Sequence, residues 1–129
     1  MGPHHRLAAA GLSLALLAGL NGAACAGHAD VLKAEIERQA DGDYRVTATL
    51  RHADSGWDHY ADRWELTGPE GQVIATRTLF HPHIDEQPFT RSLSGIHIPS
   101  TWTWVRVRAH DLVHGYGGRE VTLSVPGRR

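Results

Sequence analysis

Histidine and carboxylate side chains gather in three separate stretches of the chain, and both kinds of group are ligands for transition metals. The one cysteine, Cys25, lies in the N-terminal segment, so we expect no thiolate ligand in the folded domain. We therefore expect a divalent transition ion, Zn²⁺ or Cu(II), to be bound through imidazole and carboxylate groups. The candidate ligands are His59, His81, His83, His110, His114, Asp85 and Asp111.

The spacing of these residues permits a metal site without specifying one. His81 and His83 would project to one side of an extended segment, and His110 and His114 could close the site from another loop. The sequence contains neither an HExxH motif nor paired cysteines. The alternative is that these histidines are ordinary loop residues, hydrogen-bonded to the backbone or to nearby carboxylates.

A second class of function is a metal-free protein-interaction or spacer domain. Its candidate contact residues are Trp57, Tyr60 and Tyr116, because aromatic anchors dominate the energetics of protein interfaces. We expect a protein partner, if any, at the same end of the fold as the histidines.

Composition argues against two other classes of function. After removal of residues 1–29 the chain keeps 12 of its 13 Lys and Arg residues and all 14 Asp and Glu residues, a net charge of −2, so we expect no binding of nucleic acid. We expect no enzyme, because no serine lies in a nucleophile-elbow pattern.

Alternating apolar and polar residues predict the elements that must position these side chains. Turn signals at 40–43 and 68–71 separate the first strands. Short strands separated by such turns predict an all-β, antiparallel sandwich, with one domain at 30–126 and a flexible tail at 127–129. The seven expected strands lie at 32–37, 44–51, 63–66, 73–80, 89–93, 101–110 and 121–125.

The sixth of these strands resembles a known family. The run Pro99-Ser100-Thr101, followed by Val105, Val107 and Ala109 at alternate positions, is similar to the sixth-strand motif of fibronectin type III domains. Thr103 stands where that family usually carries a tyrosine. The resemblance implies an immunoglobulin-like topology and a binding or spacer module, and it brings no catalytic residues.

Strand parity predicts where the histidines lie. If successive strands run antiparallel, the loops after the second, fourth and sixth strands share one end of the sandwich. Of the seven histidines after residue 29, His97 belongs to the opposite end. The other six fall at the shared end: His52, His59, His81, His83, His110 and His114.

The N-terminal segment has the layout of a secretory signal peptide. Arg6 precedes an apolar run at 7–20, which is too short to span a bilayer, and small residues follow it. We expect a signal peptide at 1–29, cleavage after Ala29, a periplasmic or secreted protein, and no transmembrane segment in the mature chain.

Other processing sites remain open. Cleavage after Ala26 would also place small residues at both recognition positions, and a lipoprotein anchored through Cys25 is favoured less, because Gly22 stands where a branched apolar residue is usual. Cleavage after Gly27 would make His28 the N-terminus, whose amine and imidazole could chelate copper together with another histidine.

Overall fold

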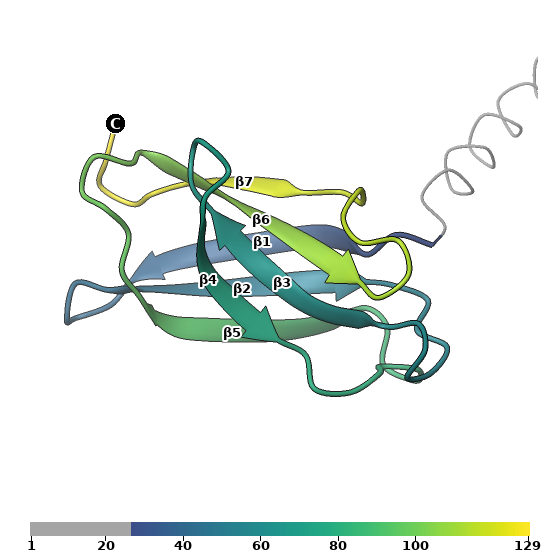
Figure 1. Ribbon diagram of the computed structural model, residues 1–129. Helices are drawn as coiled ribbons and strands as arrows, with labels where there is room; N and C mark the ends of the chain where they lie inside the picture. Colours follow the sequence, from purple (N-terminus) through teal and green to yellow (C-terminus); the bar gives the residue numbers. More distant parts are fainter. Residues whose placement is uncertain (1–26) are drawn as a thin grey trace, which may run out of the picture.

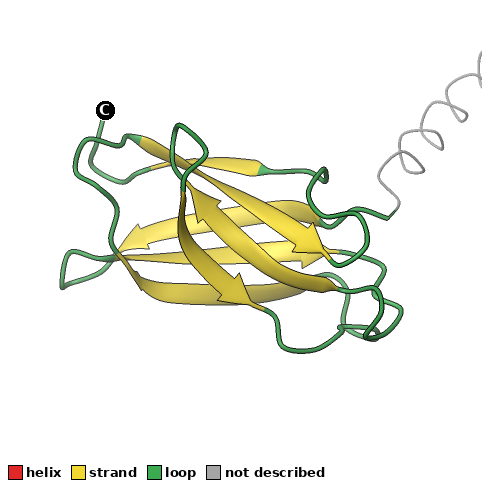
Figure 2. Cartoon of the chain, viewed as in Figure 1, coloured by secondary structure: helices red, strands yellow, loops and turns green. Residues whose placement is uncertain are grey.

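The computed structural model describes residues 27–129, which form an all-β domain (Figure 1). Seven strands account for its regular structure, and no helix occurs within the described range (Figure 2). The same part of the chain contains no helix of the length and apolarity needed to cross a membrane. The strands are β1 (Asp30–Arg38), β2 (Tyr44–Arg51), β3 (Ala61–Thr67), β4 (Val73–Thr78), β5 (Phe89–Ile96), β6 (Trp104–Asp111) and β7 (Val121–Ser124).

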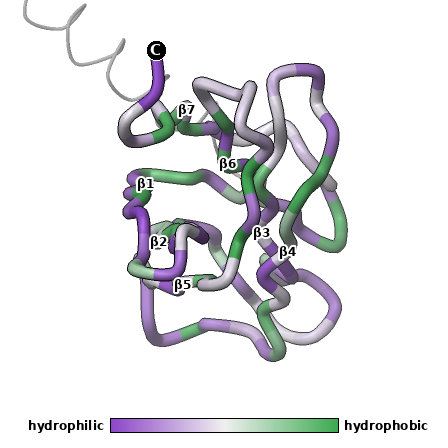
Figure 3. Tube along the Cα trace, turned by 90° about the vertical axis from the view of Figure 1, so that its left-hand side faces the viewer, coloured by the Kyte–Doolittle hydropathy of each residue, from purple (hydrophilic) through white to green (hydrophobic). Residues whose placement is uncertain are grey.

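The strands form two antiparallel sheets that pack face to face. One sheet has the order β1-β2-β5, and the other has the order β4-β3-β6-β7. In Figure 3 the first sheet lies on one side and β6, β3 and β4 lie on the other, while β7 approaches β1. The prediction of an all-β domain with seven antiparallel strands is therefore confirmed.

The core between the sheets is built from the inward positions of the central strands. In β2 the buried residues alternate with polar ones up to Leu50, and Val105, Val107 and Ala109 do the same in β6. Trp64 on β3 is completely buried among them. In β2 and β6, every second residue therefore points into one apolar layer.

Some strand ends differ from the sequence-based expectation. The sixth strand begins at Trp104, because the preceding residues form a turn in which the Trp102 amide donates to the Pro99 carbonyl at 3.0 Å. The fifth strand continues to Ile96, paired with Tyr44 of β2. At the C-terminus, the Arg128 guanidinium donates to the carbonyls of Ile98, Pro99 and Trp102.

The loops after β2, β4 and β6 lie at one end of the sandwich, at the right of Figure 1. The described chain also begins there. Ala29 is 1% exposed and belongs to the core, and the Val31 amide donates to the Arg119 carbonyl just before β7. Residues 1–26 of the predicted signal peptide lie outside the described range, and that peptide stays a prediction.

Adjacent residues of β2 provide a test of the layer arrangement. Leu50 is completely buried and Arg51 is exposed. We expect Leu50→Ala to lower the free energy of unfolding by about 2–5 kcal/mol, through lost transfer energy and a cavity. Arg51→Ala should change it by less than about 0.5 kcal/mol. Urea unfolding measures both, and equal effects would contradict the arrangement.

Candidate metal centre

Two charged or polar side chains continue the inward rows of the central strands at the loop end. His52 follows Leu50 at the next inward position after β2, and Asp111 follows Ala109 at the last position of β6. Both are almost completely buried, with 2% and 0% exposed. Because β2 and β6 belong to opposite sheets, the imidazole and the carboxylate face each other across the end of the core.

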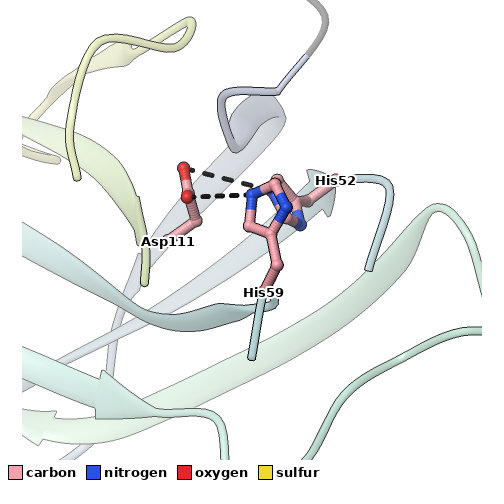
Figure 4. Close-up of side chains that lie close together, drawn as sticks. All are labelled: His52, His59 and Asp111. Atoms are coloured by element: carbon pink, nitrogen blue, oxygen red, sulfur yellow. Dashed lines mark hydrogen bonds and ion pairs between the residues drawn. The ribbon is translucent and has the colours of Figure 1, made fainter. Parts of the chain in front are cut away.

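His59, in the loop between β2 and β3, completes a group of three side chains (Figure 4). Its Nε2 lies 3.2 Å from Nε2 of His52 and 3.2 Å from Oδ1 of Asp111. Nε2 of His52 lies 4.0 Å from Oδ2 of Asp111. Ligand atoms at about 2.0–2.1 Å from a tetrahedral zinc ion are about 3.3–3.4 Å apart, so two of these three separations fit one coordination shell.

The His52 ring is held in place by Asp54. Nδ1 of His52 lies 2.5 Å from Oδ1 of Asp54, and a carboxylate can only accept, so the Nδ1–H donates. Nε2 of a neutral ring is then left with its lone pair on the side of His59 and Asp111, where the Gly27 carbonyl oxygen also lies 3.3 Å from Nε2. A carboxylate that fixes a histidine in this way is the usual outer partner of a metal-bound imidazole.

His59 is positioned by a tight loop. Its amide donates to the Gly56 carbonyl at 3.2 Å, and its carbonyl accepts from the Ser55 amide at 3.1 Å. The side chain is 25% exposed, which gives the group one side open to solvent. A bound ion would therefore have two buried ligands and one at the surface.

Asp111 is buried but incompletely paired. Its Oδ1 accepts from the amides of Val113 and His114 at 3.0 and 2.7 Å. Burial raises the pKa of Asp111, and those amide hydrogen bonds, with the nearby imidazoles of His52 and His114, outweigh it, so the pKa is lowered overall. Its buried Oδ2 has no hydrogen-bond partner within residues 27–129. An unpaired buried acceptor costs about 1–3 kcal/mol, and a cation bound there would remove that cost.

His114 lies beside this group without belonging to it. Its Nδ1 is 3.3 Å from Oδ1 of Asp111, and its ring centroid is 5.0 Å from that of His59. His59, His114 and Asp111 are thus the sequence-predicted ligands that the fold brings together.

The other predicted ligands lie apart from the group. His83 is buried and stacks on Phe89 with a centroid distance of 4.0 Å, while Nη2 of Arg91 lies 3.1 Å from its Nε2. His81 is exposed, with its Nδ1 at 3.0 Å from the Pro82 carbonyl. Asp85 is exposed in the same loop.

His110 points to the other face of its sheet. It alternates with Asp111 along β6, so the two neighbours face opposite sides. Nδ1 of His110 lies 2.6 Å from Oδ1 of Asp62, and its ring contacts Tyr116 at 4.9 Å between centroids. His110 therefore belongs to a surface network and not to the group around Asp111.

The predicted partner-binding aromatics lie at the loop end. Trp57 is 65% exposed and meets Tyr60 edge to face at 5.7 Å. The Tyr116 hydroxyl donates to Glu65 at 2.9 Å and accepts from Arg63 at 3.0 Å. Trp57 is the most accessible of the three aromatic side chains.

His52, a member of the group, and Asp54, which orients it, were not among the expected ligands or orienting residues. His52 was placed at this end by parity, and its position two residues after Leu50 is the signal that it faces inward. Asp54 also receives the amides of Ala61 and His83, at 2.9 and 2.7 Å. These hydrogen bonds join Asp54 to residues that are distant in the chain, so no local sequence pattern predicts them.

His83 predicts a pH dependence of stability. Burial, followed by the charge of Arg91, lowers its pKa. The unfolded chain therefore binds more protons at this residue, and the stability from neutral His83 is fully present above the unfolded pKa of about 6.5 and is lost as pH falls below it. The slope from one proton is at most about 1.4 kcal/mol per pH unit. His83→Gln should flatten this slope in urea unfolding with EDTA present.

His97→Gln is the matched control, because the His97 side chain is 85% exposed at the opposite end. It should leave the pH dependence unchanged. An unchanged slope in His83→Gln would show that His83 does not carry the effect.

Comparisons with known proteins give one informative similarity. The chain is 37% identical over 96 residues, 74% of its length, to a protein of Halomicrobium mukohataei named "Putative lipoprotein". That alignment covers 47% of the relative, so this chain spans about half of the relative's length. No protein-family model matches the chain, and no solved structure matches it.

Proposed function

We propose that this protein is an extracytoplasmic β-sandwich module that binds one divalent transition ion, Zn²⁺ or Cu(II), through His52, His59 and Asp111. The observation that carries the proposal is the buried Oδ2 of Asp111, which has no hydrogen-bond partner in the described chain and faces Nε2 of His52 at 4.0 Å. An ion between the three side chains would pair that oxygen.

The donor set suits either metal. Two imidazoles and one carboxylate are good ligands for zinc and for Cu(II), whereas Mg²⁺ and Ca²⁺ prefer oxygen ligands throughout. Three protein ligands leave a position for water or for another molecule. We propose a binding role and not an enzymatic one, because the sequence offers no recognisable nucleophile or protease motif beside these ligands.

We propose further that the fold is of the fibronectin type III kind. The strand orders β1-β2-β5 and β4-β3-β6-β7 support it, since they are consistent with an immunoglobulin-like arrangement of seven strands. The run of buried residues Val105, Val107 and Ala109 on β6 adds to that support.

An extracytoplasmic location is supported by the name of the Halomicrobium mukohataei relative and by the signal-peptide layout of residues 1–29. We favour a periplasmic or secreted protein released from its signal peptide. A lipid anchor on Cys25 is the alternative, and the mass of the exported protein distinguishes the two.

A metal-free interaction module is the second candidate function, favoured by apolar side chains exposed at the loop end. Phe80 is 74% exposed, Trp57 65%, Val113 59% and Ile84 58%. Such residues around one end of a sandwich resemble the anchors of a protein interface. Their partner would bind whether or not an ion is present.

Calorimetric titration tests the metal-binding function. At pH 7.5 we expect the exported protein to bind Zn²⁺ or Cu²⁺ stoichiometrically, and at pH 5.5 to bind more weakly, because the imidazole ligands must be neutral and free imidazole titrates at about pH 6.5. The double variant His52→Ala, His59→Ala should lose this binding.

The matched control is His81→Ala with His97→Ala, which removes two exposed imidazoles and should retain the ion. Lack of stoichiometric binding at pH 7.5, or unchanged binding in the His52, His59 variant, would leave the metal-free interaction module as the better explanation.

Asp54→Asn tests whether the orienting carboxylate matters. The substitution keeps the size of the side chain and replaces the carboxylate that accepts from His52 Nδ1. We expect a loss of affinity of about 10–100-fold, the usual effect of losing a carboxylate partner of a metal-bound histidine. Asp85→Asn is the control, because Asp85 is exposed at the same end and should leave affinity unchanged.

A further inference from the structure

Four imidazole rings lie side by side in space, from the buried centre to the surface. We call them the imidazole row: His52, His59, His114 and His28. Successive ring centroids are 4.7, 5.0 and 5.1 Å apart. The inner two belong to the centre already described. The outer two, His28 and His114, come from the first residues of the described chain and from the loop between β6 and β7.

Two glycines leave room for the outer rings. Gly27 has a φ of +96°, and a Cβ there would lie 2.9 Å from Cε1 and 3.1 Å from Nε2 of His114. Gly117 has a φ of +129°, and a Cβ there would lie 2.9 Å from Cδ2 and 3.0 Å from Nε2 of His28. At both glycines, a larger residue would crowd a ring edge that carries Nε2. The lack of side chains at Gly27 and Gly117 therefore lets both backbone segments pass close to the two rings.

The segment that carries His28 is fixed to the fold. Ala29, the next residue, is 1% exposed, and Asp30 accepts a hydrogen bond from the Arg119 amide at 2.7 Å. A Cβ at Gly118 would lie 1.9 Å from the Ala29 carbonyl oxygen, so the two backbones pass in close contact. His28 is thus held opposite the β6–β7 loop by backbone contacts on its C-terminal side.

His114 has the same donor arrangement as His52. Its Nδ1 is 3.3 Å from the Asp111 carboxylate, which can only accept, so the Nδ1–H donates to Asp111. Nε2 of the neutral ring then keeps its lone pair for an ion. The His114 side chain is 36% exposed, so the ring lies at the surface beside the buried centre.

We propose that His28 and His114 form a second, outer site for a divalent transition ion, Zn²⁺ or Cu(II), beside the centre of His52, His59 and Asp111. With two protein ligands and the remaining positions filled by water, the outer site binds more weakly than the inner one. The outer site deepens the proposed metal-binding function and rests on it for the ion bound at the inner centre.

The outer site requires His28 to remain in the mature protein. Cleavage after Ala29 would remove both His28 and a core residue, whereas cleavage after Ala26 or Gly27 would retain them. The intact mass of the exported protein decides this point first. A mature chain beginning at Asp30 would overturn the proposal.

Copper loading followed by equilibrium dialysis and electron paramagnetic resonance tests the outer site itself. We expect two Cu²⁺ ions per exported chain at saturation, with the second bound at least about tenfold more weakly. Two ions this close should give a half-field signal from magnetic coupling. His28→Ala with His114→Ala should reduce the count to one and abolish the half-field signal. His28→Ala alone, which leaves the contact between His114 and Asp111 in place, should keep the affinity of the inner ion within about threefold.

The reverse variant separates this proposal from the function proposed for the inner centre. His52→Ala with His59→Ala should lose the tight ion and retain the weak one, whereas His81→Ala with His97→Ala should retain both. One ion per wild-type chain that is lost in the His52, His59 variant would overturn the outer site and leave the inner centre standing. Two ions in the His28, His114 variant would also overturn the outer site. A single weakly bound ion in wild type that persists in the His52, His59 variant and is lost in the His28, His114 variant would support the outer site and contradict the inner one.

Discussion

The buried carboxylate of Asp54 is the contact on which the loop end depends. Its Oδ1 accepts from Nδ1 of His52 and from the Ala61 amide, and its Oδ2 accepts from the His83 amide at 2.7 Å. One side chain thereby connects the end of β2, the start of β3 and the loop after β4. Its side chain has no exposed surface, so each of these hydrogen bonds is made away from water and is costly to leave unmade.

Two other buried carboxylates, Glu65 and Asp111, lie in the β4-β3-β6-β7 sheet. They show how differently a fold can compensate a buried charge. Glu65 on β3 is paired with Arg63 and Arg108, both at 2.9 Å, and its lowered pKa reflects these partners and Tyr116 acting against burial. Asp111 is compensated on one oxygen alone, by the amides of Val113 and His114 and by Nδ1 of His114. Glu65 is a completed structural network, whereas Asp111 retains an unpaired acceptor directed at imidazoles.

Strand alternation and parity were sufficient to predict much of the fold from the sequence. The seven strands, and the end at which most histidines lie, follow from period-2 patterns and from antiparallel succession. Alternation also separates His110 from Asp111, because neighbouring strand residues face opposite sides, and it points His52 inward after Leu50.

The paths of the loops could not be predicted in the same way. The expectation that His81 and His83 lie together is met, with their ring centroids 4.6 Å apart, but the Asp54 contact fixes the His83 backbone and its ring packs on Phe89, so the pair lies away from Asp111. The position of His83 depends on a hydrogen bond to Asp54, which is 29 residues away in the chain. No local spacing of residues predicts such a contact. The centre of His52, His59 and Asp111 is likewise a product of tertiary packing.

The centre lies where the apolar core ends, and its ligands come from both sheets. His52 follows the end of β2 in one sheet, and Asp111 is the last residue of β6 in the other. An ion bound by both side chains would cross-link the two sheets. Apolar side chains at these positions would close the same end without buried polar groups, and such replacements often increase stability. Ligands 59 residues apart in the chain converge in the folded state, so an ion that binds only that state stabilises it by about 2.7 kcal/mol at a hundred times its Kd. Buried polar residues instead of apolar ones at this end of the core therefore favour the proposed binding role over a packing role.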